Sequence, residues 1–152
     1  MKAVIIATGL NSEMSALNER SPIPLLPVGD RPFIQHIVEA LVERGITEFD
    51  FVLHHLPEKL EHLLGDGARW GCRFQFHLAR NAARPYGMLK TLRADEPILL
   101  AHADRLPALP ANLQEHARQF PIQDLTPIKA WLCGPGRAPL PNHVGRVLRA
   151  AR

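Results

Sequence analysis

With 152 residues the chain has the length of one globular domain, and a composition of 46% hydrophobic and 22% charged residues is that of a globular protein. The net charge of +3 is small and the basic residues are scattered, which argues against binding to nucleic acid. No apolar run approaches the ~18 residues of a membrane span, and Cys72 and Cys133 lack metal-ligand spacing, so we expect a cytoplasmic protein with reduced thiols and no membrane partner.

The first predicted element is a strand over Lys2–Thr8. This short apolar run is rich in valine and isoleucine, which is typical of a central strand in a parallel sheet and too short for a signal peptide. A helix is predicted next, with Asp30 as a candidate N-cap, Pro32 in the first turn and Gly45 at its end. Its apolar residues recur at helical spacing: Phe33, Ile34, Ile37, Val38, Leu41 and Val42.

The rest of the chain alternates predicted strands and helices. Strands are expected over 48–54, 73–79, 97–103 and 127–133, and helices over 57–64, 86–92 and 111–120. This order predicts an α/β fold, a Rossmann-like three-layer domain with a mainly parallel sheet. We assign residues 1–133 to this domain and treat 134–152 as a Gly/Pro/Arg-rich C-terminal segment that leads into a weak final element.

Three segments are expected beyond the carboxyl ends of the strands, where open parallel sheets bind ligands. They are the loop after the first strand, "ATGLNSEMSALNERSPIPLLPVGDRP", the turn around Gly87, and the end of the fourth strand at Asp104. A carboxylate at a strand end suits Mg²⁺, which takes one or two carboxylates together with phosphate oxygens. A glycine lets a flat base approach the backbone. Taken one at a time, these features also occur in ordinary turns and helix caps.

In their order and spacing these segments resemble the sugar-1-phosphate nucleotidylyltransferases, from Met1 to about Asp104. "MKAVIIATGL" is similar to the family's first strand and the start of its glycine-rich loop, and "SPIPLLPVGDRPFIQHIVEALVERGI" to its proline-flanked lysine segment and first helix. "LLGDGARWGCRFQF" resembles the stretch before the third strand, "ARPYGML" the base-recognition segment, and "ILLAHAD" the strand that ends in an aspartate. The resemblance implies the N-terminal part of a nucleotidyltransferase fold and a reaction that condenses an NTP with a sugar phosphate.

The resemblance also implies which residues form the site and where the chain departs from the family. Asn11 stands in place of a loop glycine, Glu13 in place of the arginine that clamps the triphosphate, and Ile23 in place of a lysine between two prolines. In this chemistry the protein neutralises growing negative charge, and each lost donor costs roughly 10²–10³ in rate, so we assign no catalytic residue. The implied metal ligand is Asp104, and the implied nucleotide contacts are Ala7, Thr8, Gly9, Asn11, Ser12 and Gly87.

These departures favour a degenerate domain, a pseudoenzyme with weak or no catalysis. Its expected role is nucleotide-binding or regulatory, through binding of a nucleotide or nucleotide-sugar, or of a protein partner or a second copy. Only 48 residues follow Asp104, and we match none of them to the half-domain that supplies the family's sugar-phosphate site. The alternative is an active sugar-1-phosphate nucleotidylyltransferase with an altered phosphate loop and Mg²⁺ as cofactor. An unrelated Rossmann-type domain is disfavoured because no Gly-x-Gly-x-x-Gly follows the first strand.

The histidines and tryptophans have plainer explanations than metal or ligand binding. His54 and His55 are adjacent near a strand end, so their side chains are expected to point to opposite faces and not to share an ion. His102, two residues before the aspartate, is expected to be a satisfied polar residue. Trp70 and Trp131 are expected to be packing residues.

Overall fold

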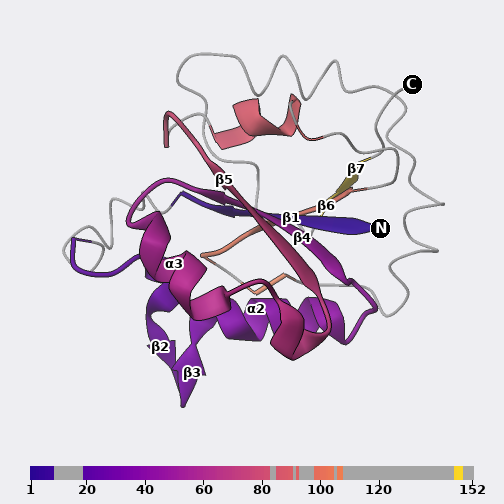
Figure 1. The fold of residues 1–152 in the computed structure, drawn as a ribbon, viewed down its shortest axis with the longest axis horizontal. Helices are drawn as coiled ribbons and strands as arrows, with labels where there is room; N and C mark the ends of the chain where they lie inside the picture. The colour runs from indigo at the N-terminus through magenta and orange to yellow at the C-terminus, as the bar shows by residue number, and fades with distance from the viewer. Residues whose placement is uncertain are drawn as a thin grey trace.

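The computed structural model describes residues 1–8, 19–82, 85–90, 92, 98–104, 106–107 and 146–148. Within these residues, five strands form one sheet in the order β5-β4-β1-β6-β7 (Figure 1). β1 pairs in parallel with both β4 and β6, β4 pairs in parallel with β5, and β7 runs antiparallel to β6. The predicted α/β fold with a mainly parallel sheet is confirmed. The strands are β1 Lys2–Ala7, β4 Glu48–Leu53, β5 Arg73–Leu78, β6 Ile98–His102 and β7 Arg146–Leu148.

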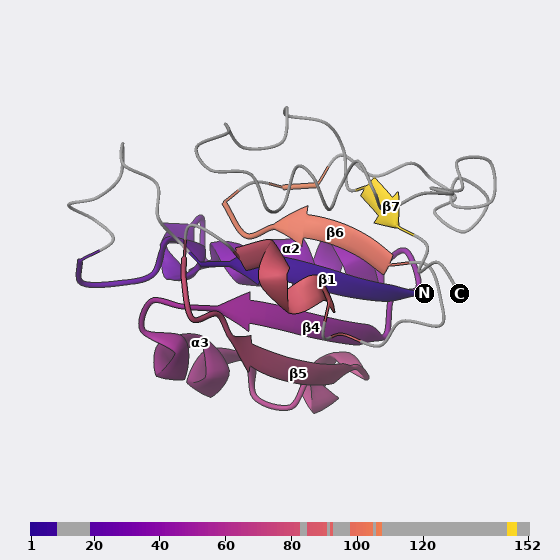
Figure 2. The same ribbon diagram turned by 90° about the horizontal axis from the view of Figure 1, so that it is seen from above.

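The sheet order places a topological switch point at β1. From β1 the chain adds β4 and then β5 on one side, and it returns to the other side of β1 with β6 (Figure 2). The chain thus adds strands on opposite sides of β1, and open α/β sheets bind ligands beyond the carboxyl ends of the strands at such a point. The helical elements are η2 Ile23–Leu25, α2 Phe33–Val42, α3 Pro57–Leu64, η3 Ala68–Trp70 and η4 Pro85–Lys90, and a small hairpin joins β2 Pro27–Val28 to β3 Arg31–Pro32.

Both faces of the central strand β1 are apolar, and its alternate residues point to opposite sides of the sheet. Ala3, Ile5 and Ala7 of β1 belong to the larger core cluster, together with buried residues of α2 and α3. Val4 and Ile6 belong to a second cluster, against which η4 packs. Figure 1 shows α2 and α3 on one side of the sheet and η4 on the other. This double burial explains why β1 lacks the polar alternation of a strand with one wet face.

Helix α2 buries the predicted apolar stripe, but Asp30 does not cap it. The N-cap is Pro32, which makes no side-chain capping bond. Gly29 and Asp30 instead form the two-residue turn of the β2–β3 hairpin, and Gly29 has the positive φ (67°) that such turns favour at their first position. The Asp30 carboxylate accepts a hydrogen bond from Arg31 Nε at 3.3 Å. The predicted cap is therefore wrong, because the hairpin turn uses this residue first.

A cluster of aromatic rings fills the space between the sheet and η3. The Phe74 ring lies edge-on to the rings of Phe49 and Phe51, with centroid distances of 5.2 and 5.1 Å. Trp70 packs beside Phe74 at 5.5 Å, as expected of an interior-facing tryptophan. Aromatic pairs in this geometry add stabilisation beyond the area that they bury.

The later predicted elements are described only in part. The predicted helix over 86–92 is a 3-10 helix over Pro85–Lys90, and the predicted strand over 97–103 is β6. The predicted helix 111–120 and strand 127–133, with Trp131 and Cys133, lie outside the described residues. Within the C-terminal segment, Arg146–Leu148 adds the antiparallel strand β7 at the edge of the sheet.

Candidate functional site

The carboxyl ends of β1, β4, β5 and β6 lie at one edge of the sheet. Backbone hydrogen bonds extend the strand pairing past the strand ends, since Ala103 N–H donates to Ile6 O (2.9 Å) and Ala79 N–H to Leu53 O (2.7 Å). Continued by one residue, the β1–β4 register places Thr8 beside His54, and continued by two residues, the β1–β6 register places Thr8 beside Asp104 on the other side. Neighbouring strands lie about 4.8 Å apart, so these groups lie close together at the carboxyl ends of the strands. We call Ala79, His54, Thr8 and Asp104 the edge row.

The edge row combines a hydroxyl, an imidazole and a carboxylate at the switch point. Thr8 is a buried polar residue, 7% exposed, whereas Asp104 is exposed and His54 is half-buried. A hydroxyl at the end of one strand and an exposed carboxylate just after the adjacent strand suit a ligand that carries both phosphate oxygens and a divalent cation.

The His54 ring is held by the backbone of the next strand. Its Nδ1 lies 2.8 Å from the carbonyl oxygen of Ala79. A carbonyl oxygen only accepts hydrogen bonds, so Nδ1 is the nitrogen that carries the proton. In the neutral ring, Nε2 then carries the lone pair. His54 was expected to be an ordinary strand-end residue. That expectation missed this hydrogen bond, because the bond joins positions that are 25 residues apart in the sequence.

The structure brings together part of the predicted nucleotide site. Ala7 is buried at the end of β1, Thr8 follows it, and Asp104 follows the adjacent strand β6. Gly87 lies in η4, whose neighbouring residues Met88 and Leu89 pack on the same sheet face as Ala79. The remaining predicted loop residues lie outside the described residues: Gly9, Asn11, Ser12 and Glu13.

Ile23 lies in the 3-10 turn η2 and is 6% exposed. The turn is flanked by prolines, Pro22 at its N-cap and Pro24 within it, and it packs against α2. Leu25 of the same turn packs against the larger core cluster. The apolar side chain of Ile23 is therefore buried at the position where the resemblance implies a lysine.

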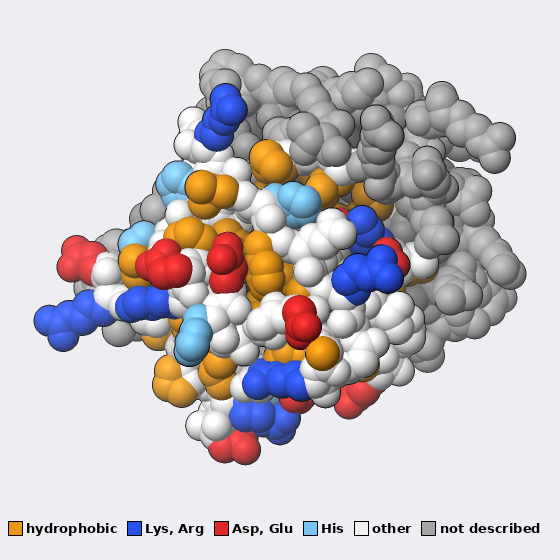
Figure 3. All heavy atoms as spheres, in the orientation of Figure 1, with side chains coloured by type: hydrophobic (Ala, Val, Ile, Leu, Met, Phe, Trp, Pro, Cys, Tyr) orange, Lys and Arg blue, Asp and Glu red, His pale blue; other side chains and the backbone are white. Residues whose placement is uncertain are grey.

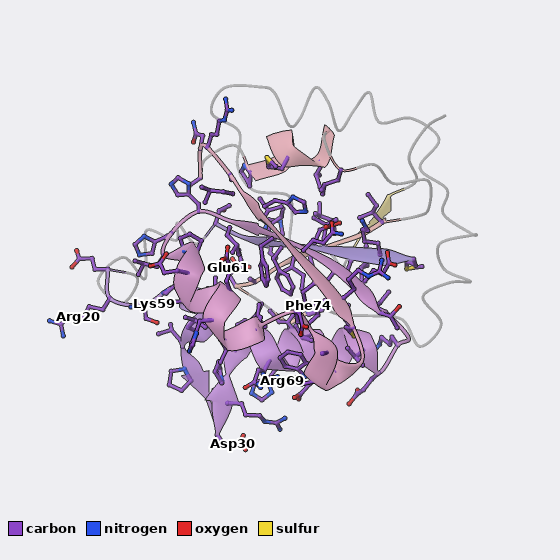
Figure 4. All side chains as sticks on the ribbon, in the orientation of Figure 1. Arg20, Asp30, Lys59, Glu61, Arg69 and Phe74 are labelled. Atoms are coloured by element: carbon purple, nitrogen blue, oxygen red, sulfur yellow. The ribbon has the colours of Figure 1, made fainter. Side chains whose placement is uncertain are left out.

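Two basic side chains near this segment, Arg31 and Lys59, already have partners. Arg31 pairs with Glu39 of α2 at 2.6 Å and with Asp30 at 3.3 Å, and its hydrogen bond lowers the pKa of the Asp30 carboxyl. Lys59 of α3 donates to the carbonyl oxygen of Arg20 at 2.7 Å, and Figure 4 shows these two residues side by side. Figure 3, which views the molecule in the orientation of Figure 1, shows acidic and basic side chains interspersed over the described residues. They do not form a patch of a single charge sign.

Mg²⁺ is the cofactor that the predicted chemistry implies. The described residues contain no group of three or more His, Cys, Asp or Glu side chains that could hold an ion by themselves. The exposed Asp104 carboxylate nevertheless fits Mg²⁺, which is usually held by one or two carboxylates, with waters and substrate phosphates completing its octahedron. The donor set thus suits a cation that arrives with a nucleotide.

Another polar cluster, which sequence reasoning did not identify, lies deeper on the same sheet face. Asp50 of β4 is fully buried, and its carboxylate contacts Lys2 of β1 and His77 of β5 at 2.8 Å each. The signal was present in the strand "EFDFVL", where an acid interrupts an otherwise apolar run. A buried carboxylate there requires partners on the neighbouring strands.

Solved structures share the fold. A Bacillus anthracis protein assigned as a glucose-1-phosphate thymidylyltransferase superposes with a TM-score of 0.67 at 22% identity, over 79% of this chain and 50% of its own. A UDP-glucose pyrophosphorylase in complex with UDP-glucose superposes with a TM-score of 0.57 at 21% identity, over 78% of this chain and 52% of its own.

Sequence comparison decides the family. The nucleotidyl transferase family model matches residues 2–118. The chain belongs to the nucleotidyl transferase family. The predicted resemblance is thereby confirmed, and the match includes the edge row and the segments that flank it.

Curated members of the nucleotidyl transferase family are longer than this chain. It is 30% identical over 110 residues to the low-salt glycan biosynthesis nucleotidyltransferase Agl11 of Haloferax volcanii, covering 70% of this chain and 31% of the relative. It is 32% identical over 117 residues to the N-acetylmuramate alpha-1-phosphate uridylyltransferase of Neisseria meningitidis serogroup B, covering 70% of this chain and 48% of the relative. The chain thus spans less than half of the length of each of these two relatives. Among the described residues, no helix is both long and apolar enough to cross a membrane.

Proposed function

We propose that this nucleotidyl transferase domain binds a nucleotide or nucleotide-sugar at the edge row and transfers nucleotidyl groups weakly or not at all. Its role is then regulatory, exerted through the bound nucleotide on a protein partner or a second copy. The observation that carries the proposal is the burial of Ile23, which stands where the resemblance implies a lysine.

The physical argument concerns charge at the transferring phosphate. A sugar-phosphate oxygen attacks the α-phosphorus in line and pyrophosphate leaves, so the protein must neutralise negative charge as it grows. A buried isoleucine supplies no charge, and Glu13 adds a negative one where the resemblance implies an arginine. With each lost donor worth roughly 10²–10³ in rate, losing two leaves binding as the stronger activity.

The residues that remain support binding. Thr8 offers a hydroxyl at the end of β1, and Asp104 offers a carboxylate on the neighbouring strand. Gly87 lies in η4, where the resemblance implies contact with the base. A Mg²⁺ ion held by Asp104 would supply charge neutralisation for the phosphates of a bound nucleotide. In the proposal these residues bind and orient the nucleotide, and no residue is assigned to proton transfer.

Two measurements on the full chain test the proposal. Isothermal titration with each NTP and Mg²⁺ measures binding, and a pyrophosphate assay with a panel of sugar-1-phosphates measures turnover. We expect saturable binding with little pyrophosphate. Robust pyrophosphate release would show that the domain is an active nucleotidylyltransferase instead, and absence of binding to any NTP would refute the nucleotide site.

Matched variants locate the site. Asp104→Asn removes the charge that holds Mg²⁺ and should weaken Mg²⁺-dependent binding. Glu61→Gln makes the same change in charge on the exposed surface of α3 and should leave binding unchanged. Equal effects of the two substitutions would indicate a general charge effect and not a ligand.

A further inference from the structure

The residues of the edge row are arranged across the sheet in an order that would let each of them contact a different part of one ligand. Asp104 follows β6, Thr8 follows β1, His54 follows β4 and Ala79 follows β5, so they succeed one another across the sheet. The proposed function places the metal and phosphates at the Asp104 end. Ala79 begins the segment that leads to η4 and Gly87, where the base is placed. The group between the phosphate end and the base end on this edge is His54.

The His54 ring is fixed in an orientation that leaves one nitrogen for a ligand. Its Nδ1–H donates to the Ala79 carbonyl at 2.8 Å, and this carbonyl belongs to a residue that is 2% exposed. His54 follows Asp50 and Val52 at alternate positions of β4, and Val52 belongs to the cluster against which η4 packs. The ring therefore lies on the η4 side of the sheet edge, half-buried and held by the backbone.

We propose that His54 binds the nucleoside part of the nucleotide, accepting a hydrogen bond at Nε2 from a base N–H or a ribose hydroxyl. The proposal rests on the proposed function and adds a specificity-determining residue to it. Phosphate oxygens offer only lone pairs, so an imidazole that presents Nε2 as an acceptor matches the donor groups of the nucleoside and not the phosphates.

The charged and titratable groups around His54 support the same assignment. On its own segment lies His55, on the β5 segment Arg80 follows Ala79, and on the β6 segment are His102 and Asp104. Asp104 is two strands away, with Thr8 between them, and deeper on the same face His77 is bonded to Asp50. Within the edge row, the carboxylate nearest to His54 is therefore that of Asp104, which the proposed function assigns to the metal. The His54 ring itself is hydrogen-bonded to the uncharged carbonyl of Ala79.

Two substitutions separate the two nitrogens of the ring. His54→Asn places an amide N–H near the position of Nδ1, which keeps the bond to Ala79 and removes Nε2. His54→Gln places a polar group near Nε2 and gives up the Ala79 bond. His55→Asn makes the first change at the adjacent residue and serves as the control. Each variant is titrated with the NTP that the wild-type protein binds best, and with tripolyphosphate, which has no nucleoside.

We expect His54→Asn to weaken NTP binding roughly three- to tenfold, the value of one neutral hydrogen bond, with tripolyphosphate binding unchanged. His54→Gln should recover part of the lost affinity, and His55→Asn should bind like the wild type. Wild-type affinity in His54→Asn, or a parallel loss of tripolyphosphate binding, would overturn the proposal. If the variants fail to fold, ¹⁵N-histidine spectra of the wild-type protein give the same answer, since added NTP should move the Nε2 resonance of His54 and tripolyphosphate should not. A wild-type protein that binds no NTP refutes the proposed function itself, a result distinct from wild-type affinity in His54→Asn.

Discussion

The Lys2 ammonium group lies 2.8 Å from Oδ2 of Asp50, joining the first residue of β1 to the middle of β4. The Asp50 side chain is 1% exposed, and its other oxygen accepts a hydrogen bond from Nε2 of His77 at 2.8 Å. The contact with Lys2 is an ion pair outside hydrogen-bond geometry, so Oδ2 gains charge neutralisation without a directed bond. A buried carboxylate in a parallel sheet is costly unless charge partners surround it, and here they come from both neighbouring strands.

Removing Lys2 should therefore destabilise the domain more than removing an exposed cation. We expect Lys2→Met to lower the free energy of unfolding by about 2 kcal/mol, because it leaves the Asp50 charge buried with one partner. Arg73→Met is the matched control, since its 3.7 Å pair with Glu48 lies on the surface and should be worth less than about 0.5 kcal/mol. Urea denaturation measures the free energy of unfolding of both variants. Equal decreases would show that the buried Lys2–Asp50 pair stabilises the fold no more than the surface pair does.

A second prediction concerns Gly67, which has a φ of +89° at the start of η3. A Cβ built there would lie 2.8 Å from Cδ1 of Phe74 and 2.9 Å from the Cys72 carbonyl oxygen. Gly67→Ala should cost about 3 kcal/mol or more, from the left-handed backbone and the displaced aromatic ring together. Gly71→Ala has a similar φ of +67° but open space around its Cβ, so about 1 kcal/mol is expected. Thermal unfolding of the two variants separates backbone strain from the clash.

Cys72 gives a prediction that depends on pH. Burial raises the pKa of its thiol above the ordinary value, because desolvation disfavours the thiolate. A raised pKa in the folded state favours the neutral form, so this group contributes no penalty below the ordinary thiol pKa and destabilises the fold as the pH rises above it. In a Cys133→Ser background, iodoacetamide should alkylate the folded protein more slowly at pH 8 than a free cysteine peptide. Equal rates would show that the thiol is exposed.

The sequence was sufficient for the elements whose apolar periodicity is local. The stripe of α2 and the apolar run of β1 are patterns within one segment, so their type and bounds were predicted well. The prediction that Asp30 caps α2 was wrong, because Asp30 lies in the turn of the β2–β3 hairpin. Whether an aspartate at this position forms a cap or a turn depends on the three-dimensional fold. Propensity alone does not decide between two local uses of one aspartate.

The site was harder to predict than the fold, because its contacts join distant segments. Thr8 and Asp104 were expected from the resemblance, and the strand order explains why they lie on adjacent strands. His54 was set aside as an ordinary strand-end residue, since nothing near it in the sequence indicates that its ring is held by Ala79. Asp50 and His77 likewise meet only because β4 and β5 pair in one register. Sheet register is the information that local patterns lack.

The charge argument for weak catalysis leads to the last prediction. Glu13→Arg changes the charge of the phosphate loop by two units at the position where the resemblance implies a clamp on the triphosphate. We expect NTP affinity to rise about tenfold, the effect of an attractive charge replacing a repulsive one near solvent. Glu19→Arg is the control, since it makes the same change in net charge at an exposed position near the end of that loop and should have a smaller effect. Adding Ile23→Lys to Glu13→Arg should raise the affinity for NTP further only if the new ammonium group reaches solvent. A lysine that stays buried in η2 would destabilise the fold instead.

Titration calorimetry of the three variants, with urea unfolding of the double variant, distinguishes these results. An unchanged affinity in Glu13→Arg would mean that residue 13 does not face phosphate, which would remove one of the two charge arguments for a non-catalytic domain.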